Sequence, residues 1–249
     1  NWSNFTKSII MKKLEVFGAA KLKGQVKISG SKNASLPILA ATLLSDKRIS
    51  LTNIPRVKDV KTMIKLLESM GSKVKVLKNK NSLIIQNDKI IKAEASYDLM
   101  STMRAGIIVL GPLLARFGKA RASIPGGCNL GFRPIDIHLE ALKKMGVKYK
   151  LVDGYINAKA KNGLVGAKIK FPKISVGATE NLMIAACLAK GQTVLSNCAI
   201  EPEIKDLSNF LCSIGAKIVW TGRRQVKIIG IKTFKQSNYK IMFDRIEAG

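Results

Sequence analysis

Hydrophobic and polar positions along the chain follow a pattern that recurs three times. In each copy, apolar residues at helical spacing form an amphipathic segment that ends on a glycine. These glycines are Gly71, Gly146 and Gly215, which lie 75 and 69 residues apart. A glycine directly after a periodic segment is typical of a helix C-terminal cap. The pattern therefore predicts three amphipathic surface helices.

Each predicted surface helix leads into two strands joined by a short turn. The turns are predicted at residues 78–81, 153–154 and 221–224. Asp153-Gly154 is a strong signal because Asp-Gly favours the two-residue turn of a β-hairpin. We therefore expect a hairpin after every surface helix.

A more uniformly apolar segment, followed by a short strand, lies upstream of each surface helix. A helix that is apolar all round is buried. The apolar segments cover residues 34–44, 103–114 and 181–189, and the strands cover residues 48–52, 119–124 and 193–197. The repeat is thus a β-α-β-α-β-β unit. Three copies predict an α/β fold with buried helices inside and with sheets and surface helices outside.

Polar residues and glycines precede the three apolar helices, at residues 29–33, 96–104 and 175–179. Serine, threonine, asparagine and glycine suit helix N-caps and leave backbone N–H groups and positive dipole ends available. If the three N-terminal ends converge, they form a floor that binds anions.

The two ends of the chain depart from the repeat. Strands are predicted at residues 14–17 and 25–29, before the first unit, and residues 240–249 look like the start of a fourth unit. Residues 1–10 look like an extension upstream of Met11. We therefore expect a truncated chain with four parts. Residues 1–10 are the extension, and residues 11–31 are the edge of a split domain that is mostly missing. Residues 32–243 form a complete domain of three repeats, and residues 244–249 are a hinge that returns into the missing half.

One loop concentrates chemistry between a predicted strand and a predicted helix, at residues 124–136. Its three glycines predict a mobile surface loop. Cys128 lies within it, and Arg121 and Arg133 flank it, which favours the thiolate form of the cysteine. Pro134 suits the first position of the following helix. This combination is typical of a lid over an anionic ligand.

The net charge of +27 raises the question of nucleic-acid binding. The basic residues are spread along the whole chain, and aromatic residues make up only 6%, too few for an obvious base-stacking platform. A lysine-biased composition is the simpler interpretation, although the charge would still attract anionic small molecules. No apolar run of about 18 residues is present, so no membrane span is predicted.

The four cysteines, Cys128, Cys187, Cys198 and Cys212, show no CxxC pair and no metal-ligand spacing, so no metal is expected. Cys187 lies in an apolar stretch and should be a core residue, with Cys198 and Cys212 similar to it. A reducing, cytoplasmic setting fits this usage best.

Several sequence blocks together carry a resemblance to a known family. The chain resembles the UDP-N-acetylglucosamine 1-carboxyvinyltransferases, which are bacterial enolpyruvyl transferases. The resemblance implies an inside-out α/β barrel with two domains of three units each. It also implies transfer of the enolpyruvyl group of phosphoenolpyruvate to the 3-hydroxyl of UDP-N-acetylglucosamine with release of phosphate and without a cofactor. This step opens peptidoglycan synthesis and so serves cell shape and division. The matching blocks are residues 22–34, 97–105, 125–128, 133–136, 175–179 and 243–249.

The resemblance also implies roles for individual residues. Cys128 would be the general acid and would form a covalent adduct with phosphoenolpyruvate, which Lys32 and Asn33 would bind. A third set would bind UDP-N-acetylglucosamine: Arg104, Arg133, Pro134, Ile135, Asp136, Ile137, Lys173, Ile174, Ser175 and Val176. The expected partners are these two small molecules and the missing half, with no nucleic acid and no membrane. His138, the single histidine, is expected to be a packing or helix-surface residue rather than a base.

The family's catalytic aspartate and a later arginine that binds phosphoenolpyruvate have no counterpart in these 249 residues. The resemblance therefore implies little turnover by this chain alone. Three alternatives remain open at this point. They are a transferase of the 5-enolpyruvylshikimate 3-phosphate synthase type, a basic nucleic-acid-binding module, and a remnant that folds but binds nothing tightly.

Overall fold

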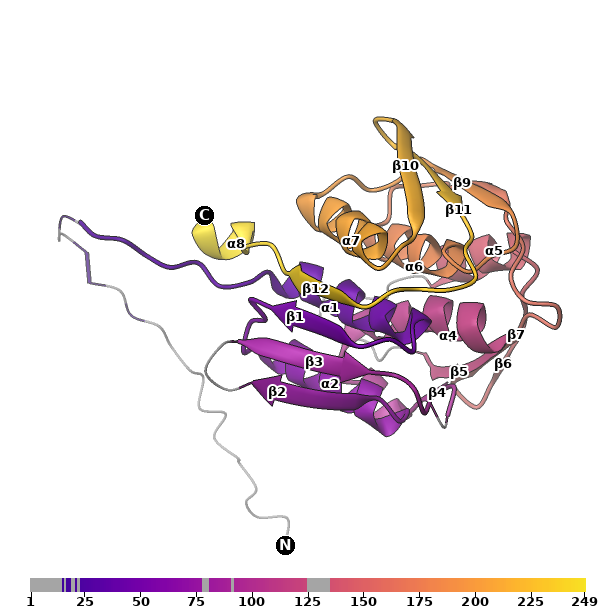
Figure 1. Cartoon of the computed structure of the whole chain (residues 1–249), viewed down its shortest axis with the longest axis horizontal. Helices are drawn as coiled ribbons and strands as arrows, with labels where there is room; N and C mark the ends of the chain where they lie inside the picture. The colour runs from indigo at the N-terminus through magenta and orange to yellow at the C-terminus, as the bar shows by residue number, and fades with distance from the viewer. Residues whose placement is uncertain are drawn as a thin grey trace, which may run out of the picture.

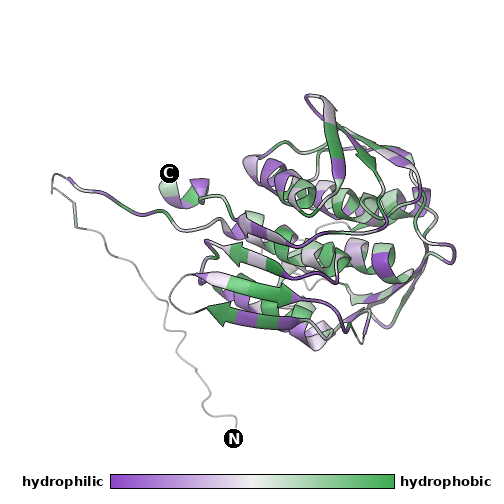
Figure 2. Cartoon of the chain, viewed as in Figure 1, coloured by the Kyte–Doolittle hydropathy of each residue, from purple (hydrophilic) through white to green (hydrophobic). Residues whose placement is uncertain are grey.

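A computed structural model describes residues 15, 17–18, 21, 23–77, 81–90, 92–124 and 135–249. Three inner helical segments lie side by side, and sheets and outer helices surround them (Figure 1). The inner segments are mostly hydrophobic (Figure 2). They consist of α1 (Lys32–Ala41) with the 3-10 turn η1 (Thr42–Leu44), η3 (Arg104–Val109) with α4 (Leu110–Phe117), and α6 (Val176–Ala186).

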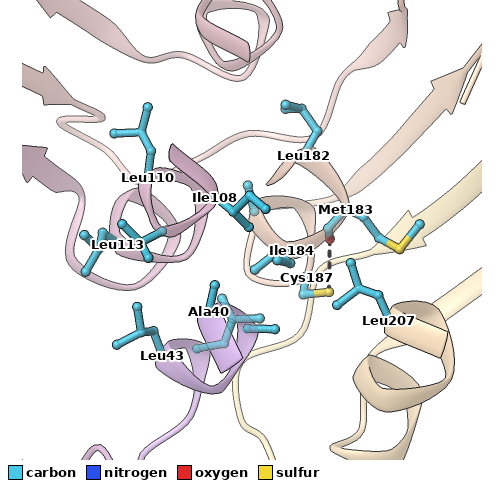
Figure 3. Close-up of a cluster of buried hydrophobic side chains, with 14 of the residues drawn as sticks. Ala40, Leu43, Ile108, Leu110, Leu113, Leu182, Met183, Ile184, Cys187 and Leu207 are labelled. Atoms are coloured by element: carbon cyan, nitrogen blue, oxygen red, sulfur yellow. Dashed lines mark hydrogen bonds between the residues drawn. The ribbon is translucent and has the colours of Figure 1, made fainter. Parts of the chain in front are cut away.

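The inner segments run in the same direction. The Asn181 side chain of α6 hydrogen-bonds to the carbonyl of Ile107 and the N–H of Gly111, so the middle of α6 lies level with the junction of η3 and α4. At the other end of the bundle, Arg116 of α4 donates to the carbonyl of Leu43 at 2.8 Å, which brings the C-terminal ends of α4 and η1 together. Further along, Gly111 also lies next to Ala185 of α6, so α4 and α6 advance in the same direction. All three N-terminal ends therefore lie on one side of the molecule. Figure 3 shows Ala40, Ile108 and Ile184 between the three segments.

The outer helices confirm the predicted repeat. Gly71, Gly146 and Gly215 all have positive φ, between 90° and 108°, after the ends of these helices. In the first, Ser72 N–H reaches back to the carbonyl of Leu67 at 3.0 Å, and the other two close in the same way. These helices are α2 (Lys58–Ser69), α5 (Asp136–Lys144) and α7 (Pro202–Ser213).

Three four-stranded sheets of identical topology cover the inner helices, and the strands described do not close into a barrel. Each sheet has one parallel pair followed by an antiparallel hairpin, and alternate residues such as Ile49 and Leu51 face the core. The first sheet contains β12 (Ser237–Lys240), β1 (Ile49–Thr52), β3 (Ser82–Gln86) and β2 (Lys73–Leu77). The second contains β4 (Glu94–Ala95), β5 (Lys119–Ser123), β7 (Tyr155–Lys159) and β6 (Lys148–Val152). The third contains β8 (Lys168–Lys170), β9 (Gln192–Ser196), β11 (Gln225–Ile229) and β10 (Lys217–Gly222).

The sequence predicted that residues 240–249 start a fourth unit, and the strand of that prediction is wrong. The strand near the end of the chain is β12, at residues 237–240, and it pairs in parallel with β1, so it completes the first sheet. It takes the place that β4 and β8 take in the other two sheets. The short helix α8 (Arg245–Ala248) follows it. The three units thus close into a ring.

Two other predictions need correction. Residues 25–29 form no strand. The segment around Phe243, which lies next to them, pairs with this part of the chain only around the single bridge between Gly30 and Phe243. The second inner segment is not one α-helix, since a short helix α3 (Tyr97–Met100) and the 3-10 segment η3 precede α4. The predicted turn at Asp153-Gly154 is confirmed, with φ of 51° and 74°. None of the helices among the described residues is long and apolar enough to cross a bilayer.

Candidate active site

The N-terminal ends of the inner helices collect predicted site residues from all three units. Lys32 and Asn33 are the first residues of α1, Arg104 opens η3, and Ser175 is the N-cap of α6. Arg104 begins a 3-10 segment rather than an α-helix. Ser31 and Ser175 accept hydrogen bonds from the helix N–H groups three residues later, as N-caps do. This face therefore presents positive helix ends to a ligand.

Lys32 and Asn33 lie beside a hollow of about 370 Å³ at the start of α1. The ammonium of Lys32 is 3.3 Å from the carboxylate of Asp59, and both side chains are partly exposed. An exposed ion pair of this kind contributes at most about 1 kcal/mol. An anionic ligand can therefore displace Asp59 at little cost, and Lys32 is available for binding. The remaining lining residues are Ser29, Gly30, Pro55, Val57, Asp244, Ile246 and Glu247.

Asp244 and Glu247 tie two distant chain segments together next to this hollow. The carboxylate of Asp244 accepts from the Lys32 N–H at 3.2 Å and from the Ile246 N–H at 2.8 Å, and Glu247 accepts from the Ser29 hydroxyl. Burial would raise the pKa of Asp244, but the backbone donors and Lys32 outweigh it, and the pKa lies below its usual value. Asp244 is therefore an ionised cap and a structural tie rather than a proton acceptor.

A second hollow, of about 100 Å³, joins α5 to the segment that leads into α6. Asp136 and Ile137 line it on one side, and Phe171 and Pro172 line it on the other. Of the two predicted segments, Asp136 and Ile137 line this hollow, whereas residues 173–176 do not. The start of α5 approaches the start of α6 elsewhere, since a Cβ atom added at Gly177 would lie 3.4 Å from Cε1 of His138. The two hollows share no lining residue.

His138 lies at the same junction and is buried. Its Nδ1 is 3.0 Å from the Asn181 amide nitrogen. Burial lowers the pKa of His138 to about 4, although the charge of Asp136 acts in the opposite direction. The imidazole is therefore neutral near pH 7. The expectation that His138 is a packing residue rather than a base agrees with this environment.

Cys128, Arg133 and Pro134 lie outside the described residues, as does the side chain of Arg104. Arg121, which was expected to favour the Cys128 thiolate, already has two partners. It donates to Glu94 at 2.7 Å, and its guanidinium lies 3.8 Å from the centre of the Tyr155 ring.

The other three cysteines differ from one another. Cys187 and Cys198 are buried, as expected, and Cys187 donates to the carbonyl of Met183 (Figure 3). Cys212 is exposed, so its expected core position is wrong. It falls on the outer side of α7, where the helical period turns it away from the neighbouring Leu211.

We predict that Cys128 is the first of the four thiols to be alkylated at pH 7. Burial raises the pKa of Cys198 to about 11 and also raises that of Cys187 and of Cys212, which disfavours the reactive thiolate at each. Iodoacetamide labelling at limiting reagent, followed by peptide mass mapping, measures the order. Modification of the exposed Cys212 before Cys128 would contradict the assignment.

Two residues near the predicted sites were not found from the sequence. Asp59, in the first turn of α2, forms an ion pair with Lys32 at the start of α1. Asn181 connects α6 to α4 and α5. Asn181 did carry a signal, because an amide in an apolar helix needs hydrogen-bond partners. Asp59 carried none, since an acidic residue in the first turn of a helix is common.

Comparisons with known proteins agree with this architecture. The model of the EPSP synthase (3-phosphoshikimate 1-carboxyvinyltransferase) family matches residues 16–249. Over 239 residues, the chain is 68% identical to the UDP-N-acetylglucosamine 1-carboxyvinyltransferase of Pelagibacter ubique (strain HTCC1062) and 49% identical to that of Trichlorobacter lovleyi. Each alignment covers 96% of this chain and 57% of the relative, so the chain spans little more than half the length of these relatives.

A solved structure shows the same fold. The enolpyruvyl transferase NikO from Streptomyces tendae matches with a TM-score of 0.81 at 20% identity, over 93% of this chain and 54% of that one. At this identity the match concerns the fold alone, which is the inside-out α/β arrangement of inner helices and outer sheets. Since the family match extends over nearly the whole sequence, the chain belongs to the EPSP synthase (3-phosphoshikimate 1-carboxyvinyltransferase) family.

Proposed function

We propose that this chain is the substrate-binding part of a UDP-N-acetylglucosamine 1-carboxyvinyltransferase, with residues 32–243 as one of its two domains. The observation that carries the proposal is the 68% identity to the Pelagibacter ubique enzyme of that name. The reaction moves the enolpyruvyl group of phosphoenolpyruvate to the 3-hydroxyl of UDP-N-acetylglucosamine and releases phosphate. It would take place in the cytoplasm, without a cofactor, and would serve peptidoglycan synthesis and thereby cell shape and division.

Lys32 and Asn33 are the proposed ligands of phosphoenolpyruvate. The positive end of α1, the adjacent hollow and the exchangeable ion pair with Asp59 all support binding of an anion there. The sugar nucleotide is assigned to the start of α5, with Ile135, Asp136 and Ile137, and to the segment at residues 173–176 that leads into α6. The contact between His138 and Gly177, which joins the starts of these two helices, supports this assignment. Arg104, Arg133 and Pro134 complete that set by resemblance.

The proposed chemistry is addition followed by elimination. The 3-hydroxyl oxygen bonds to C2 of phosphoenolpyruvate while Cys128 gives a proton to C3, and then phosphate leaves as a proton is lost from C3. The residues assigned here include no acceptor for the hydroxyl proton. We therefore expect the chain alone to bind substrate without appreciable turnover. Phosphate release should require the addition of the part of a relative that this chain does not match.

Calorimetric titration of the 249-residue chain tests the binding part. UDP-N-acetylglucosamine should give saturable heat because much of its proposed site lies in this chain, whereas shikimate 3-phosphate, the acceptor of the sister enzyme, should give none. An absence of heat at millimolar UDP-N-acetylglucosamine would count against the proposal. The reverse preference would assign the chain to the sister reaction.

A further inference from the structure

A row of three lysines crosses the second sheet on its solvent face. Lys159 of β7 lies directly opposite Lys119 of β5 and Lys148 of β6, and these three strands lie side by side (Figure 1). Neighbouring strands are about 4.8 Å apart, so the row is about 10 Å long. The three side chains are exposed, as is that of Lys150, two residues after Lys148 on the same face of β6. These four lysines are called the basic patch below.

The positive charge of the basic patch is not neutralised within the part of the chain that the structure describes. None of its four lysines forms an ion pair there. Glu94 of the neighbouring strand β4 pairs with Arg121 at 2.7 Å, one row further along the sheet. Like charges directly opposite each other destabilise a strand pair. The row Lys119–Lys159–Lys148 therefore lowers the stability of the sheet.

Protection of the sheet edge explains only one member of this row. Lys148 is the first residue of the edge strand β6, and Lys73 and Lys217 begin the edge strands β2 and β10 of the other two sheets. Lysine on an edge strand keeps sheets from pairing with one another. A lysine at this position thus has the same structural use in all three units.

The two inner strands of the second sheet differ from their counterparts. The position of Lys159 is occupied by Gln86 in the first sheet and by Ile229 in the third, and that of Lys119 by Gln192 in the third. The same topology therefore forms without these two lysines. Since they also repel each other, neither the fold nor edge protection accounts for them.

The basic patch lies away from the candidate active site. Lys119 directly follows Gly118, which caps the C-terminal end of the inner helix α4. The predicted site residues, such as Lys32 and Ser175, lie at the N-terminal ends of the inner helices. The basic patch is therefore separate from the proposed substrate sites.

The chemistry of the basic patch indicates the kind of partner that it fits. On β5, β6 and β7, the exposed large apolar side chains are Leu151 and Val152, at the hairpin end of β6. None lies in the row Lys119–Lys159–Lys148. Protein interfaces have an apolar centre, and surfaces that bind bilayers insert apolar side chains. Closely spaced cations without apolar neighbours instead match the phosphates of a nucleic-acid backbone.

We propose that the basic patch binds the phosphate backbone of a single-stranded nucleic acid, independently of base sequence. A flat sheet face suits an extended single strand whose phosphates follow the lysines. The expectation of no nucleic-acid partner rested on the spread of basic residues along the sequence. The fold removes that ground, because it places Lys119 opposite Lys159, 40 positions away. This binding activity goes beyond the proposed function and does not depend on it.

Two double variants with the same net charge test the proposal. Lys119→Gln/Lys159→Gln removes half of the basic patch. Lys168→Gln/Lys217→Gln is the control and removes two exposed lysines from the outer strands β8 and β10 of the third sheet. Fluorescence anisotropy of a labelled oligothymidylate of about 20 nucleotides, at several salt concentrations, measures the affinity of each protein.

The slope of log affinity against log salt concentration reports the number of contacted phosphates. For single strands it is about −0.7 per phosphate, so four contacts give about −2.8 for the wild type. The slope should change to about −1.4 in Lys119→Gln/Lys159→Gln and stay near −2.8 in the control. The urea midpoint of Lys119→Gln/Lys159→Gln should equal or exceed that of the wild type, because repulsion between the two lysines is removed.

Several results would overturn the proposal. They are a wild type that does not bind the oligothymidylate at low salt, equal slopes for the two double variants, and tighter binding of the wild type to phosphatidylserine vesicles than to the oligothymidylate. If Lys119→Gln/Lys159→Gln fails to fold, Lys148→Gln/Lys150→Gln on the edge strand decides, and an unchanged slope there would equally refute the proposal. Calorimetric titration with UDP-N-acetylglucosamine remains a separate test, since loss of that heat alone would refute only the proposed function.

Discussion

Replacing Gly111 by alanine should destabilise the chain by about 3 kcal/mol, although alanine is the better helix former. Gly111 lies in α4, where that helix crosses α6. A Cβ atom added there would lie 2.5 Å from the backbone carbonyl oxygen of Asn181 and 3.3 Å from the Cβ of Ala185. A backbone atom cannot rotate away, so the two inner helices would have to separate. The separation would also weaken the buried hydrogen bond from the Gly111 N–H to Asn181.

Gly222→Ala is the matched control. A Cβ atom at Gly222 would meet only the Gln225 Cβ at 3.8 Å, which is ordinary contact, so this change should stay within about 0.5 kcal/mol of the wild type. Urea unfolding followed by circular dichroism measures both variants. Equal midpoints for the two alanine variants would show that α4 and α6 do not pack as closely as described.

The repeat could be predicted from the sequence because its signals are local. The glycine after each surface helix is needed for a left-handed backbone, and Gly71, Gly146 and Gly215 all adopt one. The buried helices were recognisable from their apolar composition, and α1 and α6 have the serine caps that were expected. These features depend on residues within a few positions of each other.

The closure of the ring could not be predicted in the same way. β12 pairs with β1 although the paired residues, such as Ile49 and Ser237, are 188 positions apart, and no local pattern specifies a partner so distant. The same limit explains the wrong strand at residues 25–29, since a strand needs a neighbour and hydrophobic alternation does not supply one. The break between η3 and α4 was missed because an apolar segment looks alike in α- and 3-10 helices.

The candidate site was predicted only through the resemblance to a known family. Composition and spacing identified helix starts and a glycine-rich loop, but they did not indicate which residues meet in space. The structure places His138 of α5 beside Gly177 of α6 and puts Lys32 next to Asp59. It also shows that Asn181 connects α5 to the helical core, which follows from three-dimensional packing alone.

Glu180 should make the stability of the chain depend on pH. It lies in α6 and is almost completely buried. Burial raises its pKa well above the usual value, and the charges of Glu203 and Glu201 raise it further. Arg245 pairs with Glu203 at 2.9 Å, but the second carboxylate oxygen of Glu203 is buried and has no partner within the described ranges. A second negative charge at Glu180 is therefore costly.

The direction of the effect follows from proton binding. Between the ordinary pKa of a glutamate and the raised pKa in the folded state, the folded chain holds a proton that the unfolded chain has released. The stabilisation from Glu180 is therefore complete at pH values below the unfolded pKa and is lost as the pH rises through the folded pKa. In Glu180→Gln this titration is absent. The free energy of unfolding of the wild type should fall relative to that of the variant by up to about 1.4 kcal/mol per pH unit.

Urea unfolding of wild type and Glu180→Gln at half-unit steps from pH 4.5 to 8.5 measures this difference. The variant should gain stability over the wild type as the pH rises, because glutamine fills the same volume without a charge. Glu68→Gln, at an exposed position of α2, is the control and should follow the wild type throughout. A constant difference across the range, or a wild type that gains on Glu180→Gln at high pH, would mean that Glu180 is ionised and stabilised in the folded chain.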